Sequence, residues 1–598
     1  MLNLSRNQLL SVSKPARYVG GEYNQVIKNK NNIKCRFAFC FPDVYDIGMA
    51  NLGMKILYNV LNKREDTWCE RVFAPWPDFE ELLRKEKIEL YGLESKDSIK
   101  TFDIIGFTLQ YEMSYTNILN MLDLANIPVF SKDREEEFPF VIAGGPCASN
   151  PAPLSKFIDA FLLGEGEELI DIVAEKYVQW KKKKLPKIEF LNTIKDIPGV
   201  YVPALHTKDD KITKVVIQDI DKVDYPTNFV VPSTEIVQNK ISLEVFRGCS
   251  RGCRFCQAGY IYRPVREKST KRLLDLAKRT LENTGINEIS LASLSTSDYS
   301  DFNNLASQLI KLGEDKKVSL SLPSLRIDSI NLDILNRVQA VRKSSLTFAP
   351  EAGSQRLRDV INKNITKEDI LNGCKLAFEN GWSTVKLYFM IGLPTETFED
   401  LEEIVTLANS IVDLYYSIPR DKRKGKCSVT VSTSTFVPKP HTPFEWFGQN
   451  TLEKIELKQQ YLKERLSNKN IKYSWHNPLV SRLEAVVSRG DEKICDLIYE
   501  AFKNGAKFDS WEENLNIDAW NKAFEITGIK PENYANREYD FDYEFAWDNI
   551  MHGVEKSFLK REYEKAIKEE TTNNCMKNCA GCGVTKIANC KFINNVKN

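Results

Sequence analysis

The sequence predicts an α/β protein with two parallel-sheet units and a helical C-terminal region. Apolar strand-like runs alternate with helix-periodic segments from Cys35 to about residue 182. The same alternation resumes from Ile241 to about Trp446, and residues 450–568 are then mostly charged amphipathic helix. Strand–helix alternation at this spacing is typical of parallel sheets covered by helices. We therefore expect an open, doubly wound parallel sheet first and a partial, open (β/α)6 barrel second.

The composition is that of a globular protein, with 42% hydrophobic and 28% charged residues. At 598 residues the chain is too long for one ordinary core, which suggests about three or four domains. The formal net charge of +1 gives no global electrostatic case for binding nucleic acid or membranes. No apolar run reaches membrane-span length, and the N-terminus lacks the apolar core of a signal peptide. We therefore expect a cytoplasmic protein without a membrane partner.

The first sheet unit is expected over residues 34–195, after a polar, extended lead-in at residues 1–33. Apolar runs predict its strands, and helical periodicity predicts its helices. The expected strands are 36–41, 102–107, 140–143 and 157–163, and the expected helices are 48–62, 115–124 and 166–182. Ligands of open parallel sheets bind at the carboxyl ends of the strands, where we expect Asp46, Thr108 and the pair Gly144 and Gly145.

Short β-rich runs separated by turns predict a connector at residues 196–237. The barrel unit is expected over residues 238–447, followed by a helical C-terminal region at 448–568 and a cysteine-rich tail at 569–598. The expected barrel strands lie near 241–246, 288–292, 318–322, 345–349, 384–390 and 429–436. Barrel enzymes keep their active sites in the loops at the carboxyl ends of such strands.

Cys249, Cys253 and Cys256 follow the first barrel strand directly, with three and then two residues between them. A cubane iron–sulfur cluster takes four ligands, usually cysteine thiolates, and the next cysteine is the distant Cys374. Three local thiolates would leave one iron open to a substrate or cosubstrate. A zinc knuckle is the alternative, but zinc sites normally close with four ligands in paired spacing. We therefore favour a catalytic iron–sulfur cluster.

This loop resembles the signature of the radical S-adenosylmethionine (SAM) superfamily, whose open iron binds the amino and carboxylate groups of SAM. Three later segments are similar to superfamily elements: 350–356 to Glu-x-x-Ser-x-Arg, 388–396 to Gly-x-x-x-Glu, and 436–444 to a Pro-Lys segment. Segment 292–298 stands where the superfamily uses a Gly-Gly-Glu-like stretch, although the literal motif is lacking. The resemblance implies SAM contacts from Ser293, Glu351, Ser354, Arg356, Ile391, Gly392 and Val437.

The chemistry of two of these residues suits SAM. Glu351 can accept hydrogen bonds from ribose hydroxyls, and Arg356 can pair with a carboxylate through two hydrogen bonds. The alternative is an ordinary pair at the start of a helix, because the two residues lie one helical turn apart.

The N-terminal sheet unit resembles the cobalamin-binding domain attached to many radical SAM enzymes. The resemblance implies that the cofactor contacts are Asp46, Gly48, Asn51, Thr108, Gly144 and Gly145. Gly48 replaces the axial histidine of the usual motif, and no histidine precedes His206. Either cobalamin binds without a protein imidazole, which we favour, or the sheet is a degenerate relic or binds another ligand. Nearly the whole chain, tail included, resembles an uncharacterised full-length family of B12-binding-type radical SAM proteins.

The tail repeats the cysteine spacing at Cys575, Cys579 and Cys582, and Cys590 follows. Four thiols so close together predict a second metal site, because exposed free cysteines are a liability. Four thiolates suit zinc and iron–sulfur equally. We favour iron–sulfur because the chain is already expected to depend on that chemistry, and idle thiols in a disordered tail are the alternative.

The resemblance implies an enzyme that cleaves SAM reductively to a 5′-deoxyadenosyl radical, with an electron from a flavodoxin- or ferredoxin-type donor. Cobalamin-assisted methyl transfer to an unknown substrate is the leading expectation. Methylthiolation of RNA or protein is the second, and a non-catalytic iron–sulfur protein is the alternative from another class. The basic stretches 181–184 and 420–424 permit an RNA or ribosome-linked substrate, although such stretches are more often solvated helix faces.

Overall fold

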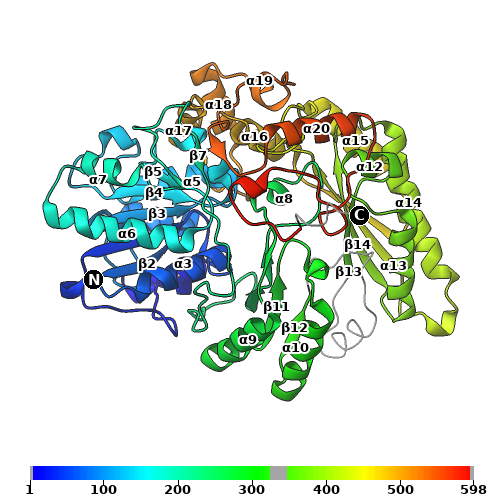
Figure 1. Cartoon of the computed structure of the whole chain (residues 1–598), viewed down its shortest axis with the longest axis horizontal. Coiled ribbons are helices and arrows are strands. Elements are labelled where there is room, and N and C mark those ends of the chain that lie inside the picture. Colours follow the sequence, from blue (N-terminus) through cyan, green and yellow to red (C-terminus); the bar gives the residue numbers. More distant parts are fainter. Residues whose placement is uncertain (1–3, 323–345, 593–598) are drawn as a thin grey trace.

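The computed structural model describes residues 4–322 and 346–592. Its N-terminal unit is a six-stranded sheet in the order β2-β1-β3-β4-β5-β6, with helices on both faces (Figure 1). The strands are β1 (Cys35–Phe41), β2 (Thr67–Phe73), β3 (Ile104–Thr108), β4 (Phe140–Gly144), β5 (Ala160–Leu162) and β6 (Val200–Tyr201). All neighbours pair in parallel except β5 and β6. The expected doubly wound sheet is confirmed.

Two helix layers cover this sheet. Helix α3 packs with α6, whereas α5 packs with α4 and with the distant α17. The helices of the unit are α3 (Leu52–Lys63), α4 (Pro77–Glu86), α5 (Tyr115–Leu124), α6 (Gly166–Lys183) and α7 (Lys187–Ile194). The lead-in is mostly irregular, with a short helix α1 (Arg6–Leu10), and it packs onto helix α4 through Tyr18, whose ring stacks on Phe79.

Strand β2 was not expected from the sequence, because charged residues interrupt its apolar pattern. Glu70 and Arg71 are both buried in it. Arg71 pairs with Glu22 and Glu94 at 2.9 and 2.7 Å, and these distant partners compensate the buried charge.

The barrel unit consists of two described parallel sheets, β12-β11-β8 and β13-β14-β15-β16 (Figure 1). Their strands are β8 (Ile241–Glu244), β11 (Glu288–Ala292), β12 (Ser319–Ser321), β13 (Leu346–Glu351), β14 (Thr384–Ile391), β15 (Ser428–Thr435) and β16 (Ile471–Trp475). All six expected strands are present, although residue 345, the expected start of one, lies outside the described residues. The structure adds β16, which the sequence analysis assigned to the helical region.

Helices alternate with these strands as expected for a (β/α) unit. They are α9 (Thr270–Thr284), α10 (Phe302–Lys316), α12 (Gln355–Val360), α13 (Lys367–Glu379), α14 (Phe398–Ser417) and α15 (Leu452–Arg465). After β8 the chain forms β9 (Phe246–Arg247), the cysteine loop, helix α8 (Ala258–Ile261) and β10 (Arg266–Glu267).

The expected β-rich connector differs from the structure. Strand β6 belongs to the N-terminal sheet, and β7 (Ile212–Thr213) pairs with β17 (Ile550–Met551) near the other end of the chain. The apolar runs at 215–217 and 229–231 form only isolated bridges. Hydrophobic β-rich runs alone do not reveal whether a partner strand is available.

The expected helical C-terminal region is divided between the two units. Helix α15 and β16 extend the barrel, whereas the next four helices share the core of the N-terminal sheet. These are α16 (Pro478–Ser488), α17 (Ile494–Lys503), α18 (Ile517–Thr527) and α19 (Glu532–Ala535). Helix α20 (Lys556–Ile567) returns to the barrel and packs on α12. Among the described residues, no helix combines the length and apolar character that a membrane span requires.

Candidate functional site

The three cysteines of the loop after β8 line one side of a pocket of about 310 Å³. Burial raises the pKa of the Cys249 thiol to about 12 and that of Cys256 to about 11, and neighbouring thiols add to both shifts. The thiolate is the metal ligand, and bound iron favours it strongly enough to overcome such shifts. The loop therefore holds Cys249 and Cys256 in an environment that favours the ionised thiol only when a cation is present, and Cys253 lines the same pocket.

The end of β13 also lines this cluster pocket. Glu351 lies there with a φ of +67°, a backbone conformation uncommon for residues with a side chain. The register of β13 against β14 shifts between Phe348 and Glu351, which re-aims the strand end. Lys363, which the sequence analysis missed, also lines the pocket and pairs with Glu351 at 3.1 Å. Backbone strain of this kind clusters at functional sites.

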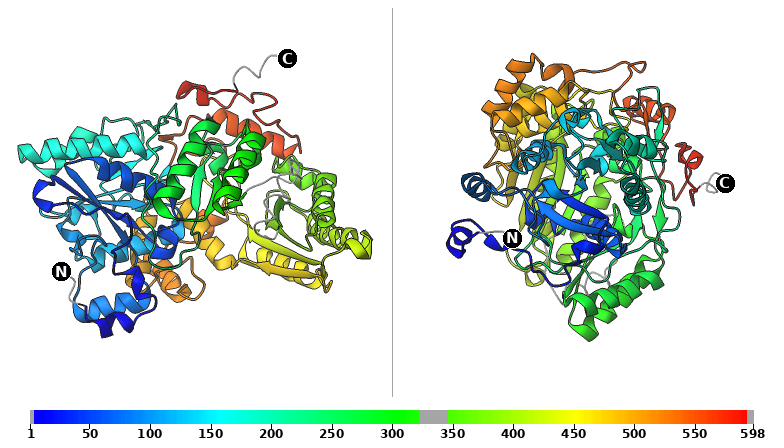
Figure 2. Two further views of the ribbon diagram at one scale, coloured as in Figure 1. Left: turned by 90° about the horizontal axis from the view of Figure 1, so that it is seen from below. Right: turned by 90° about the vertical axis from the view of Figure 1, so that its left-hand side faces the viewer.

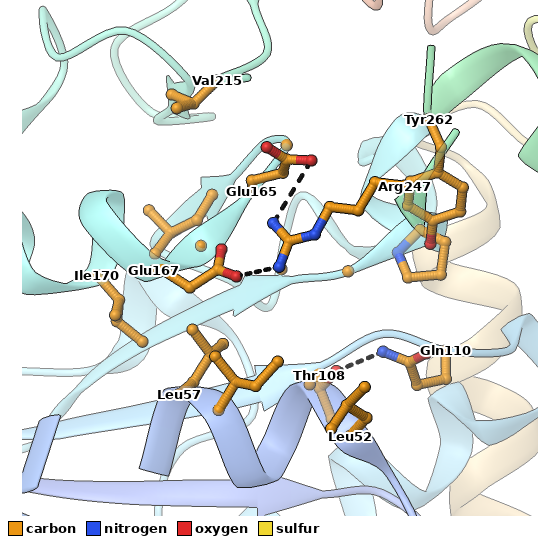
Figure 3. Close-up of a pocket in the computed structure, with 18 of the residues that line it drawn as sticks. Leu52, Leu57, Thr108, Gln110, Glu165, Glu167, Ile170, Val215, Arg247 and Tyr262 are labelled. Carbon is orange, nitrogen blue, oxygen red and sulfur yellow. Dashed lines mark hydrogen bonds and ion pairs between the residues drawn. The ribbon is translucent and has the colours of Figure 1, made fainter. Parts of the chain in front are cut away.

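A second pocket, of about 510 Å³, lies between the two units (Figure 3). The carboxyl ends of the N-terminal strands line it, as do the starts of α3 and α6 and the barrel segments around β9 and 292–294. Four residues expected to bind cobalamin line this interdomain pocket: Asn51, Thr108, Gly144 and Gly145. Asn51 caps α3 through its Oδ1 atom, and the Thr108 hydroxyl accepts a hydrogen bond from Gln110 at 2.7 Å (Figure 3).

Asp46 and Gly48, also expected at the cofactor site, lie elsewhere. Asp46 pairs with Arg17 and Lys14 at 2.6 and 2.7 Å, and so anchors the lead-in. Gly48 lines a different pocket, of about 210 Å³, and a Cβ atom there would lie 2.3 Å from the Phe73 ring. Packing against Phe73 thus requires glycine where the usual motif has histidine.

The expected SAM contacts are divided by the structure. Ser293 lines the interdomain pocket, and its hydroxyl lies 2.9 Å from that of Thr296. Of the expected contacts, only Glu351 lines the described cluster pocket. The other five, which line neither described pocket, are Ser354, Arg356, Ile391, Gly392 and Val437.

Ser354 and Arg356 tie helices together. The Ser354 hydroxyl caps α12 and donates to Asp400, and the Arg356 guanidinium pairs with Asp400 and with Glu569 at 3.0 Å. Arg356 also donates to the Thr395 carbonyl at 2.9 Å. These contacts occupy the fork that the sequence analysis assigned to a SAM carboxylate.

The residues at the end of β14 serve packing. Ile391 is buried in the barrel core, and Gly392 has a φ of +78° with its N–H bonded to Glu396 at 2.8 Å. A Cβ atom on Gly392 would lie 2.7 Å from Ile455, so α15 needs glycine here. Val437 packs against the core of the N-terminal unit.

Arg247 joins the two units beside the cluster loop. Its guanidinium pairs with Glu165 and Glu167 at the start of α6 (Figure 3). It also pairs with Glu244 of β8 at 2.9 Å. Burial opposes ionisation of Glu244, but Arg247 and Lys268 hold its pKa at about 2. This network was not expected from the sequence, where its local signal is an arginine two residues before Cys249.

The tail lies against the cluster loop, since the Arg254 guanidinium donates to the Glu570 carbonyl at 2.7 Å. Figure 2 shows the red C-terminal segment beside the green part of the barrel unit. The Cys575 N–H donates to the Ser250 carbonyl at 2.9 Å, and the buried Arg263 interacts with the thiols of Cys582 and Cys575. Burial raises the pKa of Cys575 and Cys590, while Arg263 opposes the rise. Among the described residues, no three metal-ligating side chains converge tightly enough for a single metal ion.

A partial parallel barrel with three cysteines after its first strand defines an iron–sulfur enzyme. Residues 243–408 match the model of the radical SAM superfamily, and residues 53–203 match that of the N-terminal region of radical SAM proteins. An uncharacterised protein of Methanocaldococcus jannaschii is 30% identical over 82% of this chain and 97% of its own length. The chain belongs to the radical SAM superfamily, and it is an enzyme that uses SAM and a 4Fe–4S cluster.

More distant similarities leave the substrate open. An uncharacterised methyltransferase of Pyrococcus horikoshii is 24% identical over 53% of this chain and 67% of its own length. The structure of TsrM from Kitasatospora setae, a radical SAM methyltransferase with cobalamin and a 4Fe–4S cluster bound, has a TM-score of 0.46 and 13% identity, covering 67% of this chain and 74% of that one.

Proposed function

We propose that this enzyme transfers a methyl group with the help of cobalamin held in the interdomain pocket, while SAM binds in the cluster pocket. One observation carries the proposal: Leu294, 43% exposed, lines both pockets. Gly248 lines the interdomain pocket and Cys249 lines the cluster pocket, so the two sites also meet along the chain. Radical chemistry requires reacting groups held close together and away from water.

The donors of the cluster pocket fit an iron–sulfur cluster and SAM. Cys249, Cys253 and Cys256 would hold the cluster, which supplies the electron that cleaves SAM when both are bound. Lys363 can pair with the carboxylate of the methionine moiety, and Glu351 can accept hydrogen bonds from its amino group or from ribose hydroxyls. We assign the SAM contacts to this pair, with Ser354 and Arg356 as supports of the helix that follows Glu351.

The interdomain pocket fits a large, partly apolar ligand with amide groups. Leu52, Leu57 and Ile170 form apolar walls (Figure 3), and Asn51 and Thr108 place polar groups at the strand ends. Gly145 has a φ of +113°, and a side chain there would collide with the Leu109 backbone. Cobalamin, when bound, supplies a methyl carrier. Glycine at this position lets the turn after β4 pack against the Leu109 backbone at the edge of the pocket.

The protein's own part in the reaction is positioning. Arg247 pairs with the buried Glu167 and with the partly buried Glu165 and Glu244, and it fixes α6 of the N-terminal unit to the strand next to the cluster loop. Both units contribute residues to the lining, so the pocket is complete only when the two units are packed together. The electron is proposed to come from an external flavodoxin- or ferredoxin-type donor.

We assign a second iron–sulfur centre to Cys575, Cys579, Cys582 and Cys590. Electrostatic interactions link Cys575 and Cys590 to Cys579 and Cys582, so the four thiols lie near one another. Four thiolates suit zinc and iron–sulfur equally, and we favour iron–sulfur because the enzyme already uses that chemistry. A second cluster would also suit methylthiolation, which is therefore the alternative reaction.

The basic stretches do not favour an RNA substrate. Lys181 pairs with Asp103, and Arg423 donates to backbone carbonyls of Ile418 and Tyr416. Both side chains thus serve local structure, and an RNA or ribosome-linked substrate is proposed only on the resemblance.

The test is anaerobic reconstitution with iron, sulfide and cobalamin, followed by reduction in the presence of SAM. We expect 5′-deoxyadenosine, bound cobalamin, and about eight irons per chain. A cluster-replete protein that forms no 5′-deoxyadenosine would overturn SAM cleavage, and one that retains no cobalamin would overturn the cofactor assignment. Nucleoside mass spectra of RNA from cells with and without the gene test the RNA substrate, which an unchanged profile would exclude.

A further inference from the structure

His552 lines the interdomain pocket although it lies more than three hundred residues beyond the sheet that forms most of it. The residue is 7% exposed. Within the part of the chain that the structure describes, neither of its ring nitrogens has a hydrogen-bond partner. Buried polar groups are nearly always paired, so an unpaired imidazole beside a pocket points to a partner in that pocket.

Local structure holds this imidazole in place. His552 directly follows β17, which pairs with β7, and the Lys214 N–H donates to the Met551 carbonyl at 3.1 Å. Gly553 follows with a φ of +83°, and a Cβ atom there would lie 2.4 Å from Ile587 of the tail. A strand pair on one side and a glycine turn on the other therefore fix the backbone of His552.

The ring is also held by a second histidine. The rings of His441 and His552 meet edge to face with centroids 4.5 Å apart. The His441 Nε2 atom lies 3.0 Å from the Ser149 carbonyl, which anchors that ring to the loop after β4. His441 is thus engaged with the protein, whereas His552 faces the pocket.

The side chain of His552 is of a type that binds metals, because a neutral imidazole carries a lone pair on one of its two ring nitrogens. Neutral imidazole is the commonest nitrogen ligand to metals in proteins.

We propose that His552 binds the cobalt of the cobalamin in the interdomain pocket through an imidazole nitrogen. The inference rests on the proposed function. The N-terminal unit has Gly48 where the usual cobalamin motif has its histidine. In this proposal the C-terminal segment supplies the histidine instead, because the fold brings His552 to the pocket. The other histidines are engaged or distant: His206 accepts a hydrogen bond from the Val202 N–H, and His476 follows β16 outside the pocket lining.

The test is the electron paramagnetic resonance spectrum of the full-length protein loaded with cob(II)alamin, with the iron–sulfur clusters kept oxidised and EPR-silent. Protein is prepared with natural-abundance histidine and with 15N-histidine. A histidine nitrogen on cobalt splits the lines into triplets with 14N and into doublets with 15N. We expect this change in the wild-type protein, its loss in His552→Ala, and its retention in the matched control His476→Ala.

The outcomes separate the two proposals. The wild-type protein could retain cobalamin and give the same spectrum with either nitrogen isotope in its histidines, either unsplit or split by the cofactor's own base. That result would overturn the His552 ligand, but the proposed function would stand. A wild-type protein that retains no cobalamin would overturn the proposed function itself. If His552→Ala does not fold, the labelled wild-type spectrum decides alone. Persistence of the label-sensitive splitting in a folded His552→Ala protein would also overturn the assignment.

Discussion

The backbone N–H of Cys575 donates a 2.9 Å hydrogen bond to the carbonyl of Ser250, which lies between the first two cysteines of the cluster loop. Residues more than three hundred positions apart thereby bring two cysteine clusters side by side. Arg263 strengthens the junction, because its guanidinium donates to the Arg251 carbonyl and interacts with the Cys582 thiol. A second centre at the tail would consequently lie next to the SAM-cleaving cluster.

The tail centre is tested by Cys575→Ser combined with Cys579→Ser. We expect iron after reconstitution to fall from about eight to about four per chain, while the absorbance of the remaining cluster and SAM binding persist. Cys374→Ala, at a buried thiol remote from both clusters in sequence, is the control and should leave iron unchanged. An unaltered iron content in the double variant would show that the tail holds no cluster.

Lys363→Met is expected to weaken SAM binding by about 10- to 100-fold, because a charge-assisted hydrogen bond contributes about 1.5–3 kcal/mol. Isothermal titration with SAM on the reconstituted protein measures the change. Arg356→Gln is the contrasting variant. It should leave SAM affinity within about threefold and lower thermal stability, because Arg356 pairs with Asp400 and Glu569. If Arg356→Gln weakened SAM binding and Lys363→Met did not, the SAM carboxylate would be assigned to Arg356 instead.

Arg247→Ala is expected to lower the free energy of unfolding by about 3–5 kcal/mol, because it leaves the buried Glu167 without this partner. Arg266 and Lys268 still pair with Glu165 and Glu244 in the variant. Urea unfolding followed by circular dichroism measures the loss. Arg247→Lys should recover part of it, since an ammonium keeps the charge without the planar fork. The control Arg279→Ala removes an exposed pair and should change stability by about 0.5 kcal/mol or less. Equal effects of the two alanine variants would contradict a structural role for the Arg247 network.

We expect the buried carboxyl of Glu445 to make the stability of the folded protein depend on pH. Burial raises the pKa of its carboxyl to about 7 in the folded protein, against a reference value of 4.5. The folded state therefore binds more protons than the unfolded state between these values, so stability is full below pH 4.5 and falls as pH rises to about 7. Glu445→Gln should flatten this slope while retaining an acceptor for the N–H groups of His441 and Trp547.

Melting temperatures measured between pH 4.5 and 8 check this expectation. Buried Asp509, whose pKa burial raises to about 6, adds a slope of the same sign, so Asp509→Asn should flatten the profile in part. A slope that survives in the double variant Glu445→Gln and Asp509→Asn would contradict the assignment.

Much of the fold could be predicted because its elements carry local signals. The strands around Phe39, Ile105 and Val141 are apolar runs, and α5 shows helical periodicity. The local sequence of each element therefore predicts its conformation. Strand β2 carries Glu70 and Arg71, and its burial depends on partners elsewhere in the chain. Helix α17 is amphipathic, but its sequence does not say which sheet its apolar face covers.

By itself the sequence determined the superfamily chemistry, because three thiols at a set spacing after a strand form a local ligand group. Only the tertiary structure decided which residues surround it. Arg356 has the right chemistry for a carboxylate, yet Asp400 and Glu569 occupy it, while Lys363 reaches the cluster pocket. The interdomain pocket acquires His552 only when β17 pairs with β7. Local spacing encodes what a segment can bind, whereas long-range packing determines what lies opposite it.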